Sequence, residues 1–256
     1  GWQRSFYDAG YSQMIPGYLT SWSGPRLESE IPYRSGDGLT FPQLDKGKTS
    51  FGTEGLIFLS GERATIKRAV LDYGSVTAGC STLRKYFNRD LTAFACLDDI
   101  PPGTDTQGHV VAVIGWDDSF PKERFNLFSR PENDGAWLVK SSWGTGRGEN
   151  GCYWISYEDK YLFSKRFGKN YAITKVQKIK RSWRLLQNEI YGATWDMTVY
   201  KAENGNKNYQ NKITYSNVFD FSGGYNRVEQ VIFESECAGA QYTVRYIPLQ
   251  NGIPTE

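Results

Sequence analysis

The sequence has very few residues of the kinds that build metal centres. It contains one histidine, His109, and four cysteines, none of which forms a Cys-x-x-Cys pair. Zinc sites in proteins need three or four closely spaced cysteine and histidine ligands, so this composition argues against a zinc site. We expect no metal and no cofactor.

The chain also has no long apolar run and no excess of charge of one sign. No stretch approaches the ~20 apolar residues that span a bilayer, so the sequence predicts no transmembrane segment. Thirty basic and 28 acidic residues give a net charge of +2, which provides no reason to expect nucleic acid as a partner. The chain begins with Gly1 and no signal segment follows, so we expect that an upstream part has been removed.

Aromatic residues, in contrast, are plentiful. The chain holds 8 Trp, 17 Tyr and 14 Phe against 2 Met, a balance that favours β-rich packing over a helical bundle. A mass of 29.1 kDa allows one large or two ordinary domains. Turn signals crowd the first sixty residues, and helices are predicted over residues 11–22 and after Gly61. Strands are predicted over residues 75–80, 109–116, 135–140 and 152–157 and in alternating runs past residue 186, with a surface loop over residues 117–134.

Two cysteines end short β-prone runs and leave two interpretations open. Cys80 closes the run 75–80 and Cys96 closes the run 91–96, so the two could be bridged as neighbours on adjacent strands. Such a disulfide would suit an extracellular protein. Buried free thiols are the other interpretation.

His109 opens an apolar strand, and a glycine-rich loop follows about thirty residues later. The strand reads Gly-His-Val-Val-Ala-Val-Ile-Gly-Trp from residue 108, and the loop reads Lys-Ser-Ser-Trp-Gly-Thr-Gly-Arg-Gly-Glu-Asn-Gly from residue 140. A thiol nucleophile needs a base beside it and a third group that orients the base. His109 is well placed to be that base. A polar residue of the loop could orient its ring, and Trp143 could shield the hydrogen bond between them from water.

These two segments resemble the C-terminal half of papain-like cysteine peptidases, in which a His-Ala-Val strand precedes an Asn-Ser-Trp-Gly loop. The insert at 117–134 and the segment at 18–33 resemble a prokaryotic, secreted or surface subgroup with a C-terminal lectin-like domain. The resemblance implies an α+β papain-like fold, incomplete at its N-terminus, followed by an all-β lectin-like sandwich. The expected domains are a peptidase domain over 1–163, a connector over 164–185 and a lectin-like domain over 186–256.

Carried over position by position, the resemblance assigns His109 as the catalytic base. It places Ser141 where the family has the asparagine that orients the base, and Trp143 where a tryptophan covers this pair and borders the leaving-group side of the cleft. Gly10 falls in a segment whose backbone binds the substrate. Each residue also has an interpretation without a role in catalysis. His109 would be a structural histidine and Ser141 a loop serine. Trp143 would be a packing aromatic residue and Gly10 a turn glycine.

Three departures from the family pattern bear on activity. Ser141 is shorter than asparagine, and Ala9 replaces the first glycine of the substrate-binding segment. The Cys-Gly-x-Cys-Trp motif that carries the nucleophile is absent, and family spacing places it roughly 20 to 40 residues before Gly1. Cys80 lies only 29 residues before His109, in a strand-like run, and is a poor candidate for the nucleophile.

We therefore expect a cysteine endopeptidase whose cysteine is supplied from upstream of this chain, so that the chain alone is inactive. The alternative is a catalytically dead pseudopeptidase that serves as a surface binding or scaffold protein. The expected partners are a protein or peptide substrate, the protein's own cleaved N-terminal segment and a cell-surface glycan, and the expected location is secreted or cell surface. Aromatic residues of the C-terminal domain could stack on sugars or simply pack, and they are Tyr191, Trp195 and Tyr225. Acidic residues of the insert could bind calcium or simply be solvated, and they are Asp117, Asp118 and Asp134.

Overall fold

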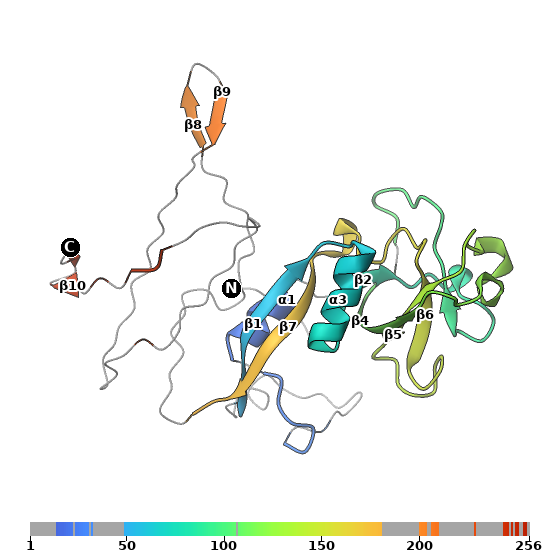
Figure 1. Ribbon diagram of the computed structural model, residues 1–256, viewed down its shortest axis with the longest axis horizontal. Helices are drawn as coiled ribbons and strands as arrows, with labels where there is room; N and C mark the ends of the chain where they lie inside the picture. The colour runs from blue at the N-terminus through green and yellow to red at the C-terminus, as the bar shows by residue number, and fades with distance from the viewer. Residues whose placement is uncertain are drawn as a thin grey trace. The chain divides into compact units, whose positions relative to one another are not determined.

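The structure is a computed structural model that describes most of the first 180 residues and short parts of the rest (Figure 1). The described residues are 14–22, 24–30, 32, 49–105, 107–180, 200–203, 206–209, 228, 243–245, 247, 249–250 and 253–254. The chain divides into two compact units, Gly1–Thr198 and Val199–Glu256. None of the described helices combines the length and the apolar character that a bilayer crossing requires.

A seven-stranded sheet organises the first unit. Its strand order is β1-β7-β2-β4-β5-β6-β3, and every pairing is antiparallel except that of β3 with β6. The strands are β1 (Phe51–Leu59), β2 (Val76–Ser81), β3 (Ala93–Phe94), β4 (Gly108–Asp117), β5 (Ala136–Lys140), β6 (Cys152–Ser156) and β7 (Asn170–Lys178). The helices are α1 (Met14–Thr20) and α3 (Arg63–Tyr73), and the 3-10 helices are η1 (Arg84–Tyr86), η2 (Lys122–Arg124), η3 (Leu127–Ser129) and η4 (Lys165–Phe167).

Helix α3 packs on β2, β4 and β7, and Figure 1 shows it lying along these strands. Ile66, Ala69 and Val70 recur at helical spacing and are buried, so this face of the helix contacts the sheet. Gly74 ends the helix with a φ of 85° and donates its N–H to the carbonyl of Val70, which is the arrangement that favours glycine at this position. The predicted helix and its stop are therefore confirmed, although Tyr73 is exposed.

The main core lies between α3 and the central strands. Alternate residues of β2 and β4 point into it, and they are among the most buried in the molecule: Val76, Ala78, Cys80, Val111 and Val113. The predicted strands at 75–80, 109–116, 135–140 and 152–157 are confirmed as β2, β4, β5 and β6, each to within one or two residues.

The insert at 117–134 has more internal structure than a solvated loop. Phe120 and Phe125 are buried in a second small core beside Ala136, and their rings meet edge to face at 5.4 Å. The Asn126 side chain donates to the backbone carbonyls of Lys85 and Phe87, which anchors the insert to η1. The insert is thus fixed to the body of the first unit.

Three findings differ from the sequence-based expectations. Cys80 and Cys96 are free and buried, so the disulfide alternative is wrong. Strand β1 falls among the turn signals of the first sixty residues and was not predicted. Strand β7 lies inside the segment 164–185 that we expected to be a connector; it pairs with β1 over its whole length and with β2 at Tyr171. Residues 170–178 are therefore part of the sheet.

In the second unit the structure describes short strands and a few single residues between them. Strands β8 (Tyr200–Glu203) and β9 (Asn206–Tyr209) form an antiparallel pair, as do β10 (Leu249–Gln250) and β11 (Ile253–Pro254). Most of the predicted alternating runs, together with the residues considered for sugar stacking, lie outside the described residues. The domain boundaries drawn from the sequence stay a prediction.

Candidate active site

His109 stands where the core meets solvent. It is the second residue of β4, and it shares a face of the strand with Val111 and Val113, which are fully buried. The antiparallel register places it directly opposite Cys80 of β2. Because the next residues on this face are locked in the core, the backbone that carries the half-buried imidazole is fixed.

The loop after β5 brings two more side chains to the histidine. Lys140, the last residue of β5, pairs with Ala112 of β4, so the chain that continues past it runs back alongside residues 109–111. The Ser141 N–H donates to the Gly151 carbonyl at 2.9 Å, which closes the base of the loop. Gly148 has a φ of 59°, and a Cβ there would lie 2.2 Å from the carbonyl oxygen of Cys152. Glycine is therefore required at this turn.

The imidazole is held by a hydrogen bond and by a ring contact. His109 Nε2 lies 3.0 Å from Ser141 Oγ. The Trp143 ring stacks on the imidazole with centroids 4.8 Å apart and an angle of 18° between the planes. Within the described part of the chain, Nδ1 has no hydrogen-bond partner. When Nε2–H donates to Ser141, the lone pair is on Nδ1, and this atom can accept a proton.

Burial sets the charge of this imidazole. It lowers the pKa of His109 below the ordinary value, because the charged form loses solvation. The ring is therefore neutral at pH 7 and able to accept a proton. A group of this kind can act as a general base toward an acidic proton placed at Nδ1.

Trp143 in turn rests on other aromatic residues. Tyr153 of β6 stacks on it with centroids 5.9 Å apart and nearly parallel planes, and Phe87 contacts it at 6.2 Å. The Arg147 guanidinium lies 5.7 Å from the Trp143 ring. Tyr153 and Phe87 were not predicted as part of the site. Their only signal in the sequence is their type, because the contact depends on how distant strands pair.

Cys80 is close to this group, yet its thiol is not a nucleophile. The sulfur is fully buried and lies 3.9 Å from the Tyr153 hydroxyl. Burial raises the pKa of the thiol to about 12, and the charge of buried Asp159 adds to this effect. The thiolate, which is the reactive form, is therefore not populated at neutral pH.

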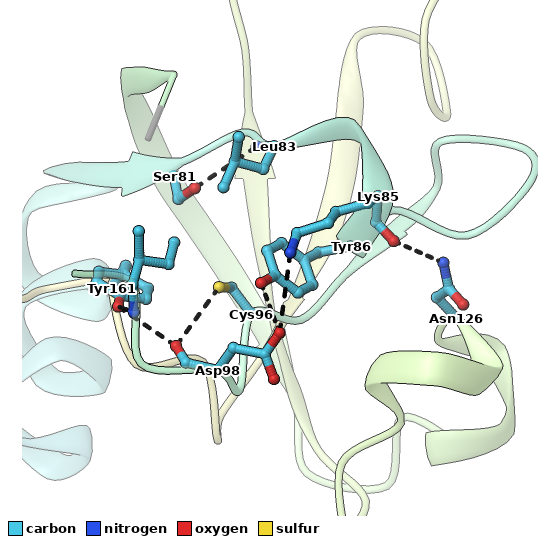
Figure 2. A network of polar contacts seen from close by, with 9 residues as sticks. Ser81, Leu83, Lys85, Tyr86, Cys96, Asp98, Asn126 and Tyr161 are labelled. Atoms are coloured by element: carbon cyan, nitrogen blue, oxygen red, sulfur yellow. Dashed lines mark hydrogen bonds and ion pairs between the residues drawn. The ribbon is translucent and has the colours of Figure 1, made fainter. Parts of the chain in front are cut away.

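The other described cysteines, Cys96 and Cys152, lie away from the imidazole of His109. Figure 2 shows the Cys96 thiol directed to the Asp98 carbonyl, while the Asp98 carboxylate accepts a hydrogen bond from Tyr86. Burial raises the pKa of Cys96 to about 11. Cys152 begins β6, where it pairs with Lys140 and not with His109. Among the described residues no cysteine therefore presents a reactive thiol to His109, and Cys237 lies outside them.

The remaining candidates are placed as follows. Gly10 and Ala9 lie outside the described residues. Asp118 pairs with Lys67 at 2.5 Å and accepts a hydrogen bond from the Tyr157 hydroxyl at 2.7 Å. Asp117 and Asp134 accept hydrogen bonds from nearby backbone N–H groups. In the described ranges no group of histidine, cysteine and acidic side chains converges as metal ligands would.

Comparison with known proteins places this chain in a family. The profile of the papain family of cysteine proteases matches residues 7–170. No curated protein matched the chain. Solved structures do match it, and two of them are structures of the protease Cwp84, one of which is described as a surface layer associated protein of Clostridium difficile.

The first of these structures contains the cysteine protease and lectin-like domains of Cwp84. It is 40% identical, with a TM-score of 0.61, and the match covers 69% of this chain and 38% of that one. The second is a cysteine-to-alanine variant of the clostridial protease after propeptide cleavage. It is 38% identical, with a TM-score of 0.67, and the match covers 76% of this chain and 47% of that one. The chain thus spans less than half the length of either structure.

The profile match covers more than half of the chain, and the expected α+β fold is confirmed. His109, Ser141 and Trp143 come together on this fold as the resemblance implied. The chain belongs to the papain family of cysteine proteases.

Proposed function

We propose that this chain carries the histidine half of a cysteine endopeptidase, and that the nucleophilic cysteine lies in the polypeptide before Gly1. The observation that carries the proposal is the pair His109 Nε2–Ser141 Oγ at 3.0 Å, which holds the imidazole under Trp143 and leaves Nδ1 for a thiol. The buried, high-pKa thiols of Cys80 and Cys96 support a nucleophile from elsewhere.

The chemistry follows from the two ring nitrogens. His109 Nδ1 takes the proton of the thiol, and the thiolate attacks the carbonyl carbon of the scissile peptide bond. The imidazolium then gives this proton to the leaving amine, and the C–N bond breaks to leave an acyl-enzyme. Neutral His109 next takes a proton from water, and the water oxygen attacks the thioester carbon. The C–S bond then breaks, the acid leaves, and the thiolate and the protonated imidazole are restored for the next cycle.

Ser141 performs the orienting role in this scheme. A hydroxyl can accept Nε2–H as an amide oxygen does, and its distance of 3.0 Å from Nε2 lies in the normal hydrogen-bond range. The hydroxyl is on a shorter side chain and rotates about its own bond. We therefore propose that Ser141 orients the base less firmly than asparagine would, and that Trp143 provides part of the restraint.

A second candidate function is that of a pseudopeptidase, which binds proteins at a surface without cleaving them. The replacement of the orienting asparagine by Ser141 and of a substrate-segment glycine by Ala9 favours it. The fold is the same in both cases. The two functions therefore differ only in whether a thiol meets His109 Nδ1.

The partners and location follow the same proposal. The substrate is a protein or peptide, and the protein's own cleaved N-terminal segment is a second partner, since one related structure is described as following propeptide cleavage. We place the protein outside the cell or at its surface, as the related surface layer associated protein is. Residues 186–256 would form the lectin-like domain and bind a cell-surface glycan.

The test uses the polypeptide extended to include the residues before Gly1. An endopeptidase cleaves a mixed peptide library, and a thiol-directed epoxide adds once, to a cysteine upstream of Gly1. His109→Ala abolishes cleavage, whereas Asn126→Ala, which alters the insert, leaves it. A folded extended protein that neither cleaves nor takes up the epoxide is a pseudopeptidase.

A further inference from the structure

Tyr153 contacts two residues that lie beside His109, namely Trp143 and Cys80. Its ring stacks on Trp143 with centroids 5.9 Å apart and an angle of 7° between the planes, and Trp143 stacks on His109. Its hydroxyl lies 3.9 Å from the sulfur of Cys80, the residue that pairs with His109 across β2 and β4. The contacts thus form a closed circuit from His109 through Trp143, Tyr153 and Cys80 back to the histidine strand.

Tyr153 and Trp143 differ in how firmly their surroundings hold them. Tyr153 is 2% exposed and sits in β6, between β5 and β3, and the Phe87 ring meets it edge to face at 5.2 Å. Trp143, by contrast, lies in a loop whose neighbouring residues Ser142 and Gly144 are exposed. The position of the tryptophan ring therefore depends on the buried aromatic residues behind it.

The same dependence extends to the imidazole. The β4 backbone fixes where the ring begins, but the ring can still rotate about its bond to Cβ. One hydrogen bond to Ser141 and one stacked contact with Trp143 oppose that rotation. If the Trp143 ring can move, the His109 ring can therefore rotate more easily.

We propose that Tyr153 is a positioning residue of this site: its ring holds Trp143 against the His109–Ser141 pair, and its hydroxyl fixes the ring to Cys80. The effect on catalysis rests on the proposed peptidase function, whereas the effect on the orientation of His109 does not. Cys80 has a role in this arrangement as a buried thiol that the reaction itself does not use.

The single histidine makes the test direct, because every imidazole signal in an NMR spectrum of the chain comes from His109. Tyr153→Leu removes the stacked ring, and Tyr153→Phe keeps the ring and removes only the hydroxyl. Trp154→Leu is the matched control, since Trp154 is the next residue of β6 and stacks instead on Phe120 in the second core. The ring ¹⁵N shifts report the ratio of the two neutral tautomers.

We expect the unsubstituted chain and Trp154→Leu to show mainly the Nε2–H tautomer. Tyr153→Leu should lower the ratio of the Nε2–H to the Nδ1–H tautomer about fivefold, the factor that corresponds to an aromatic pair of about 1 kcal/mol. Tyr153→Phe keeps the stacked ring and should change this ratio only slightly. If Tyr153→Leu does not fold, Tyr153→Met replaces it with an unbranched apolar side chain and the same expectation.

A folded Tyr153→Leu or Tyr153→Met chain with an unchanged tautomer ratio would overturn the proposal, and so would an equal change in Trp154→Leu. In the extended, active protein we expect Tyr153→Leu to lower kcat about fivefold with KM unchanged. Because the NMR result needs no activity, it decides the role of Tyr153 even if the unsubstituted protein proves to be a pseudopeptidase.

Discussion

Removal of the Ser141 hydroxyl is the perturbation that tests the base most sharply. Ser141→Ala deletes the oxygen 3.0 Å from His109 Nε2 and keeps the backbone bond from Ser141 to Gly151 that closes the loop. A hydrogen bond between neutral groups contributes about 1 kcal/mol, and one to a charged group about 1.5–3 kcal/mol. The imidazole is half-buried and becomes charged as the thiol is deprotonated. We therefore expect a loss of about 1–2 kcal/mol in the transition state, or about 5- to 30-fold in kcat/KM.

The same substitution has a second, independent consequence. The hydroxyl accepts more strongly from the imidazolium than from neutral imidazole, so it stabilises the charged form. Its loss should lower the pKa of His109 further than burial already does. An NMR titration of the one histidine measures this directly in the unextended chain.

The kinetic assay uses the extended polypeptide and a fluorogenic peptide. Ser142→Ala is the control, because Ser142 is the exposed neighbour in the same loop. Ser141→Asn should retain activity, since its amide oxygen can take the place of the hydroxyl. If Ser141→Ala stays within about twofold of the unsubstituted protein, or if Ser142→Ala costs as much, Ser141 does not orient the base.

Three further substitutions or treatments test the surroundings of the site. Gly148→Ala places a Cβ 2.2 Å from the Cys152 carbonyl oxygen at a φ of 59°, so urea denaturation should show a free energy of unfolding lower by about 3 kcal/mol. Gly146 has open space around it, so Gly146→Ala should change the free energy of unfolding by less than about 0.5 kcal/mol. Burial raises the pKa of Asp159 from 3.8 to about 6, so the protonated carboxyl stabilises the fold and this contribution is lost as pH rises through 6. Between pH 4 and 7 the free energy of unfolding should fall by about 2 kcal/mol on this account, and Asp159→Asn should abolish this slope. Cys80 and Cys96 should react with a water-soluble disulfide reagent only after denaturation, and rapid reaction of either in the native chain would contradict their burial.

Local signals in the sequence were sufficient to predict the central helix and strands of the fold and to identify three residues of the site. Helix α3 has apolar residues at helical spacing and a glycine stop, and β4 is an apolar run between two glycines, so each could be identified without knowledge of its neighbours. His109, Ser141 and Trp143 were found because their order and spacing match a family pattern. Their burial and distances confirm that they meet, while their roles stay predictions.

The contacts that depend on pairing between distant strands could not be found in this way. Strand β7 was placed in a connector because residues 158–185 are basic and weakly patterned. Its partner in the sheet is β1, which lies more than a hundred residues earlier in the chain. Strand β1 is interrupted by Gly55, where its register with β7 shifts, and this weakens its alternating pattern. Tyr153 belongs to the site only because of the β4-β5-β6 order, which no local pattern specifies.

The proposed function requires that His109 forms a catalytic pair with a cysteine before Gly1. The most direct measurement is the rate at which iodoacetamide alkylates that cysteine as a function of pH, in the extended protein and in its His109→Gln variant. A paired cysteine is a thiolate well below the ordinary thiol pKa of about 8.5, so we predict rapid alkylation already near pH 6 and a shift of the profile to about 8.5 in the variant. A profile centred near 8.5 in both proteins would contradict the pair, and with it the proposal that this chain carries half of a peptidase active site.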